Sequence, residues 1–130
     1  MSTTHSPRAI LVDDSFELRM LLRILLQDAG WEIVGEAGDG DEAVALCEAT
    51  PCEAVIMDLN MPRMDGIEAT RLIKRRRPET TVVAFTCTAD ALTAQALVDA
   101  GASCHFDKPD VNALVAYLAE LGSPAAAKAA

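Results

Sequence analysis

Three aspartates, a threonine and a lysine stand where short apolar runs of this sequence end. They are Asp13, Asp14, Asp58, Thr86 and Lys108. Carboxylates that converge repel one another and raise one another's pKa, and a divalent cation relieves that repulsion. Carboxylate oxygens completed by water suit Mg²⁺, with Mn²⁺ as a possible substitute. The residue types therefore indicate a cation site, provided that the fold brings them together.

The same set has the parts of a phosphoryl-transfer site. One carboxylate would attack phosphorus, while the cation and Lys108 neutralise the phosphoryl oxygens and Thr86 donates a hydrogen bond to another oxygen. Each residue alone has an ordinary explanation, such as Asp14 capping a helix or Asp58 being a loop acid. Their joint occurrence at successive run ends favours a site.

The apolar runs are the elements that must position these residues. They lie at 9–12, 33–34, 54–57, 82–85 and, more weakly, 103–106. Three of them are continuously apolar, which is typical of parallel strands covered on both faces. Helical patterns alternate with the runs, so we expect an α/β fold of five βα units, a doubly wound parallel sheet with helices on both faces. The carboxyl ends of its strands, where ligands bind, would gather the polar residues.

Helix boundaries are marked by capping residues and apolar faces. The first helix has Leu18, Leu22, Leu25 and Ala29 on one face, with Gly30 after its end. The other predicted starts are Asp39-x-x-Glu42, Asp65-x-x-Glu68, and Thr88 or Asp90 for a helix that runs to Gly101. After the second run the chain offers Gly35 and Glu36, which indicate little about function.

Length and charge restrict the function further. A chain of 130 residues makes one domain, and its net charge of −9 lies entirely in residues 1–65. Such a chain is not expected to bind nucleic acid directly.

The apolar runs of the chain are far shorter than the roughly 20 residues of a membrane helix, and its first residues lack a signal core, so we expect a cytoplasmic location without membrane contact. The four cysteines lack zinc spacing and are expected to be core residues.

Four stretches resemble the receiver domain of bacterial two-component response regulators, including chemotaxis receivers. They are Ile10–Ser15 (ILVDDS), Val55–Gly66 with its Asp-x-x-x-Pro-x-x-x-Gly spacing, Phe85-Thr86 and Lys108-Pro109. The resemblance covers residues 8–121 and implies a flavodoxin-like fold for this receiver (phosphoacceptor) domain. We expect residues 1–7 and 122–130 to be flexible termini.

The resemblance implies a role for each matching position. Asp58 would be the phosphoacceptor and, with Asp13, Asp14 and the backbone carbonyl of Asn60, would bind Mg²⁺, Asp13 largely through water. Lys108 would pair with Asp58 and then with its phosphoryl group.

The resemblance also implies a conformational change. Thr86 would move toward the phosphoryl group and so act in the switch. Pro62, Gly66 and Pro109 would shape the loops around the site.

The chain departs from the family pattern in three respects, one of which is Cys87 in place of the small alanine common after the threonine. The switch position three residues before Lys108, usually aromatic, is His105, whose titration near neutral pH would make inward burial pH-dependent. Asn60 and Thr88 stand where side chains tune hydrolysis of the aspartyl phosphate. Thr88 offers neither a carboxylate nor an amide to orient water, so we expect a slow decay.

The implied function is phosphorelay signal transduction and not enzymatic turnover of an external substrate. The phosphodonor would be a sensor histidine kinase or a phosphotransfer protein. The fourth helix, fifth strand and fifth helix would form the face that changes on phosphorylation. That face would control a downstream protein or an output domain, and it could support a homodimer.

Three alternative functions fit the residues less well. A flavodoxin-type cofactor binder is disfavoured because Asp13 and Asp14 would repel a phosphate. An aspartyl-phosphate hydrolase is disfavoured because Asn60 replaces the general acid two residues after Asp58. A phosphorylation-independent adaptor would have no use for the complete polar set, yet it stays the main alternative.

Overall fold

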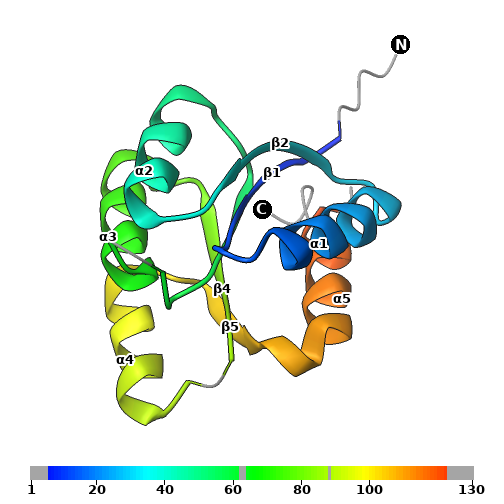
Figure 1. Cartoon of the computed structure of the whole chain (residues 1–130). Coiled ribbons are helices and arrows are strands. Elements are labelled where there is room, and N and C mark those ends of the chain that lie inside the picture. The colour runs from blue at the N-terminus through cyan, green and yellow to red at the C-terminus, as the bar shows by residue number, and fades with distance from the viewer. Residues whose placement is uncertain (1–5, 62–63, 88, 123–130) are drawn as a thin grey trace.

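The computed structural model describes residues 6–61, 64–87 and 89–122, in which strands and helices alternate along the chain (Figure 1). The strands are β1 (Arg8–Val12), β2 (Glu32–Ala37), β3 (Ala54–Met57), β4 (Thr81–Thr86) and β5 (Cys104–Asp107). The helices are α1 (Phe16–Asp28), α2 (Gly40–Ala49), α3 (Gly66–Arg76), α4 (Ala91–Ala100), the short 3-10 helix η1 (Lys108–Asp110) and α5 (Val111–Leu121). Within these ranges no helix combines the length and the apolar character that a membrane span needs.

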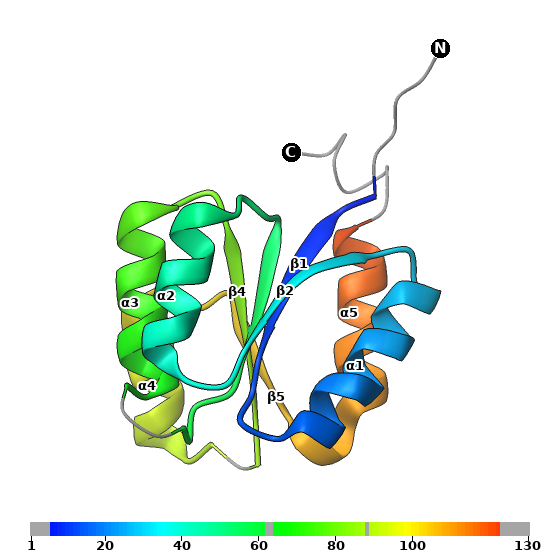
Figure 2. The same ribbon diagram turned by 45° about the horizontal axis from the view of Figure 1, so that its top comes forward.

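All five strands are parallel and lie in the order β2-β1-β3-β4-β5. Helices α1 and α5 cover one face of the sheet, and α2, α3 and α4 cover the other (Figure 2). The predicted doubly wound α/β fold is therefore confirmed. The strand order reverses direction between β1 and β3, so the ends of these two strands form the crevice where such sheets bind ligands.

Alternate residues of each strand enter two different cores. In β1, Leu11 packs with Leu22 and Leu26 of α1, whereas its neighbour Ile10 packs with Ile73 on the α3 side. Burial on both faces explains why the central strands are apolar throughout.

Two core predictions need correction. In α1, Leu18, Leu22 and Ala29 pack in the core as predicted, but Leu26 and not Leu25 is the residue that is fully buried with Leu22. Cys47 and Cys52 are buried as expected, but the prediction was wrong for Cys87, whose side chain is exposed just beyond β4.

The predicted caps fix the helices that leave the strand ends. Asp39 accepts a hydrogen bond from the Glu42 amide, Asp65 accepts one from the Glu68 amide, and Asp90 caps α4. Thr88, the other candidate for the α4 cap, lies outside the described residues. Gly101 ends α4 with a φ of 106°, a left-handed conformation that glycine adopts without steric cost.

Candidate functional site

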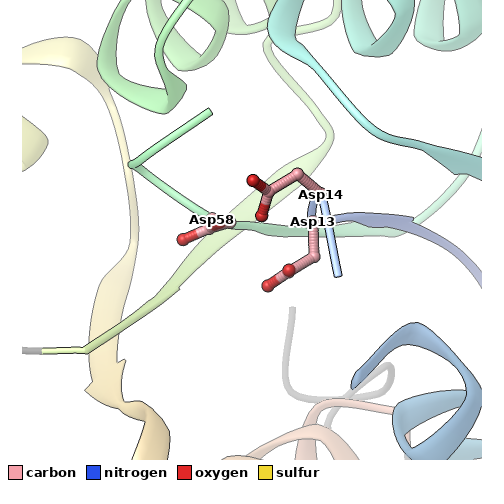
Figure 3. Close-up of side chains that lie close together, drawn as sticks. All are labelled: Asp13, Asp14 and Asp58. Atoms are coloured by element: carbon pink, nitrogen blue, oxygen red, sulfur yellow. The ribbon is translucent and has the colours of Figure 1, made fainter. Parts of the chain in front are cut away.

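The carboxyl ends of β1 and β3 bring three carboxylates together, as Figure 3 shows for Asp13, Asp14 and Asp58. One oxygen of each lies within 4.8 Å of the others. Asp13 and Asp58 are buried, whereas Asp14 is exposed. Ser15, not Asp14, caps α1, so the ordinary explanation for Asp14 does not hold.

The backbone of Asp58 is bonded to the end of β1. Its amide donates to the Val12 carbonyl at 2.9 Å, which joins the two strand ends, and its side chain is 3% exposed. Burial raises the pKa of Asp58, and the nearby charge of Asp13 raises it further. The Lys108 ammonium and the Asn60 amide oppose that rise without cancelling it. The ionised form of the Asp58 carboxyl is therefore disfavoured in the folded protein.

Lys108 connects the two buried carboxylates. Its Nζ lies 3.0 Å from Asp13 Oδ2 and 3.4 Å from Asp58 Oδ1. Burial lowers the pKa of Lys108, but the hydrogen bond to Asp13 and the charges of Asp58 and Asp13 outweigh it and leave the pKa raised. Lys108 is therefore a permanent cation facing Asp58 at neutral pH.

The other residues predicted for the site lie on β4, β5 and η1. Thr86 is buried at the last position of β4, in register with Asp107. His105 lies one strand further out, in register with Ala84, and its side chain is exposed. Pro109 lies in the exposed part of η1, directly after Lys108.

Gly66 fixes the loop that follows Asp58. Its amide donates to the Leu59 carbonyl, and a Cβ at this position would lie 2.1 Å from the Asp58 carbonyl oxygen. A side chain would therefore displace the backbone of Asp58. Asn60 lies in the same loop with an exposed side chain. Pro62 and Thr88, also predicted to act near the site, lie outside the described residues.

Sequence reasoning missed an arginine pair that borders the cluster. Arg19 and Arg23, four residues apart on α1, both bind Glu36 of β2. Arg19 also donates from Nη1 to the Asp13 carbonyl. The four-residue spacing places both arginines on one side of the helix, but nothing in the sequence indicates Glu36 as their partner.

The charge on Asp58 leads to a stability prediction. Because burial and Asp13 raise its pKa in the folded state, the ionised carboxylate reduces stability above that pKa and has no effect below the ordinary aspartate value of about 3.9. We expect Asp58→Asn, without divalent cations, to raise the melting temperature by roughly 3–8 °C at neutral pH.

Melting curves followed by circular dichroism at neutral pH and near pH 3 test this sign. The difference between wild type and Asp58→Asn should vanish at the lower pH, where both side chains are neutral. A variant that melts below the wild type at neutral pH would contradict the assignment of Asp58 as a destabilising charge.

Curated proteins that resemble this chain include a transcriptional regulatory protein and a chemotaxis protein. It is 44% identical over 104 residues to the transcriptional regulatory protein PdtaR of Mycobacterium tuberculosis, covering 79% of this chain and 50% of that protein. It is 32% identical over 102 residues to the chemotaxis protein CheY of Thermotoga maritima, covering 78% of this chain and 85% of that one. The chain thus spans half the length of PdtaR.

Solved structures and family comparison agree with these relatives. A LuxR-family two-component response regulator from Aurantimonas superposes with a TM-score of 0.76 at 32% identity, over 85% of this chain and 86% of that one. The family described as "Response regulator receiver domain" matches residues 9–119. With strand order, acidic cluster and paired lysine already described, the chain belongs to the response regulator receiver family of two-component systems.

Proposed function

We propose that Asp58 accepts a phosphoryl group from a phosphohistidine in a Mg²⁺-dependent reaction, and that this changes the α4–β5–α5 face. The observation that carries the proposal is the position of Lys108 Nζ, 3.4 Å from Asp58 Oδ1 and 3.0 Å from Asp13 Oδ2. A lysine in this position holds the acceptor carboxylate at one oxygen and leaves the other for attack.

The donor set fits a hard divalent cation. Receiver domains bind Mg²⁺ at an acidic pocket, and here three carboxylates converge with Lys108 as the cation in contact with two of them. The site therefore has excess negative charge. Asp13, Asp14, Asp58 and the Asn60 carbonyl would hold the ion, and oxygen ligands of this kind suit Mg²⁺, with Mn²⁺ as a substitute. Bound there, the ion would neutralise charge on the phosphoryl oxygens.

The transfer step follows from the position of the carboxylate. An Asp58 oxygen forms the new bond to phosphorus as the phosphorus–nitrogen bond of the phosphohistidine breaks, and the imidazole leaves with that electron pair. Lys108 stays beside the phosphoryl oxygens and compensates their charge. The product is an aspartyl phosphate.

The site connects to the proposed face through β4 and β5. Thr86 ends β4 beside Asp107, and two residues earlier Ala84 pairs with His105 of β5. We propose that Thr86 moves toward the phosphoryl group and that His105 turns inward from its exposed position. The pH dependence of this movement and slow phosphoryl loss, governed by Asn60 and Thr88, stay predictions.

The partners proposed for this domain are a histidine kinase or phosphotransfer protein as donor and a downstream protein or output domain as target. A homodimer through α4, β5 and α5 is a further proposal. Because PdtaR is twice as long as the matched segment, its activity is not transferred to this chain. The domain limits 8–121 stay a prediction, as does a role confined to signalling without turnover of external substrates.

A small phosphodonor tests the proposal without the cognate kinase. The chain is incubated with phosphoramidate, with and without Mg²⁺, and its intact mass is measured. We expect the mass of one phosphoryl group to be added in the presence of Mg²⁺ and not in Asp58→Asn, because an amide is a poor nucleophile toward phosphorus.

An adaptor that works without phosphorylation predicts a different result. It would show no Mg²⁺-dependent mass increase, and its partner binding would survive in Asp58→Ala. Uptake by Asp58→Asn at the wild-type rate would contradict the proposed acceptor.

A further inference from the structure

Arg19 joins the acidic cluster to the edge of the sheet. From α1, its Nε donates to Glu36 Oε1 of β2 at 2.9 Å, and its Nη1 donates to the backbone carbonyl of Asp13. The side chains of Arg19 and Glu36 are only 17% and 25% exposed, so the contact is largely shielded from solvent. One guanidinium thus connects a helix, a strand and the loop that carries two of the three carboxylates.

Each polar group of Asp13, in the backbone and in the side chain, has a bonding partner. Its amide donates to the Ala37 carbonyl at 3.0 Å, Oδ1 accepts from the Ser15 amide at 2.8 Å, and Oδ2 contacts Lys108. Arg19 holds the remaining group, the carbonyl. That carbonyl belongs to the peptide unit that continues into Asp14, and a peptide unit is planar. Fixing it therefore sets the direction in which the backbone of Asp14 leaves Asp13.

Glu36 offsets part of the positive charge of the arginine pair. A lone guanidinium beside a cation site would repel the cation, but Glu36 binds Arg19 and also Arg23, whose Nε lies 2.9 Å from Glu36 Oε2. Burial raises the pKa of Glu36, but hydrogen bonds from Arg23 and Arg19 outweigh it and keep the pKa below its usual range. Glu36 therefore stays ionised and offsets one of the two positive charges, while Arg19 acts on Asp13 as an oriented donor.

We propose that Arg19, supported by Glu36, is a positioning residue of the cation site, which orients the Asp13–Asp14 peptide so that both carboxylates meet one divalent ion. The inference rests on the proposed cation site. It goes beyond that site because it assigns affinity to a side chain that does not reach the ion. Arg23 binds the same glutamate without contacting Asp13 in the described structure, and so it is the matched control.

Cation affinity separates positioning from simple electrostatics. Arg19→Gln and Arg23→Gln each remove one positive charge near an acidic cluster, and Coulomb's law alone predicts that both bind a cation more tightly. Positioning predicts the opposite sign for Arg19 alone. Because a residue that orients metal ligands typically contributes 10-fold to 100-fold in affinity, we expect Arg19→Gln to weaken binding about 10-fold.

The measurement is a titration of the full chain with Mn²⁺, followed by the electron paramagnetic resonance signal of the free ion. We expect Arg23→Gln to stay within about twofold of the wild type, because it leaves the Asp13 carbonyl bonded. Arg19→Lys keeps the charge and one donor nitrogen, so its affinity for Mn²⁺ should lie between those of the wild type and Arg19→Gln. Circular dichroism checks that each variant is folded.

Each outcome decides between the proposals. Binding by Arg19→Gln as tight as the wild type, or equal weakening in Arg19→Gln and Arg23→Gln, would overturn the role of Arg19 and leave the cation site intact. A wild type that binds no Mn²⁺ would overturn both. If Arg19→Gln does not fold, Arg19→Lys is compared with Arg23→Lys: weaker binding in the former supports positioning, and equal binding overturns it.

Discussion

Lys108→Met should slow the uptake of a phosphoryl group by Asp58 by about 100-fold, the usual loss when one preorganised charge-stabilising group is removed. The lysine acts twice in the proposed step. It lowers the pKa of Asp58 against the effects of burial and Asp13, and it remains beside the oxygens that gain charge. The rate is measured by intact mass, with phosphoramidate as the donor and Mg²⁺ at saturation.

Lys108→Arg is the control for charge. It keeps the cation between Asp13 and Asp58 but changes its shape, so we expect it to retain stability and to recover only part of the rate. If Lys108→Met reacted within about threefold of the wild type, Lys108 would have no part in the transfer step. Its contacts with Asp13 and Asp58 would then serve only to neutralise buried charge.

Gly66→Ala should destabilise the fold by about 2–4 kcal/mol and abolish most phosphoryl uptake, because added volume in a packed region forces the backbone to move. The new Cβ would lie 2.1 Å from the Asp58 carbonyl and 2.9 Å from the Leu59 Cα. Neither atom belongs to a flexible side chain, so relief requires movement of the acceptor itself. Urea unfolding and the same mass assay measure the two effects.

Gly38→Ala is the matched control. A Cβ at Gly38 has its nearest neighbour, the Arg19 Nη1, at 3.8 Å, which is an ordinary contact. We expect this variant to keep stability within about 1 kcal/mol of the wild type. Equal losses in Gly38→Ala and Gly66→Ala would mean that the close approach to Asp58 does not limit the site.

The sequence was sufficient to predict the arrangement of the strand ends. Continuous apolar runs are a strong signal for parallel strands buried on both faces, and Asp13, Asp58, Thr86 and Lys108 each lie at or just beyond the end of one. Parallel topology then requires these ends to share one edge of the sheet. Helix starts were also predictable, because a cap such as Asp65 acts on an amide only three residues away.

Contacts between charged residues far apart in the sequence were not predictable in the same way. Glu36 accepts from arginines 17 and 13 residues earlier, and no local preference specifies such a pairing. The burial of Leu26 in place of Leu25 depends on how α1 is rotated against the sheet and α5, which tertiary packing decides. The exposure of Cys87 likewise follows from its place beyond the end of β4 and not from its hydrophobicity.

The most direct test of the central claim is to locate the phosphoryl group. After treatment with phosphoramidate and Mg²⁺, the chain is reduced with borohydride, which converts an aspartyl phosphate to homoserine, and is then digested and sequenced by mass spectrometry. We predict homoserine at position 58 alone, and none when Mg²⁺ is omitted. Homoserine at Asp13 or Asp14, or a phosphoryl group on another residue with position 58 unchanged, would contradict the account.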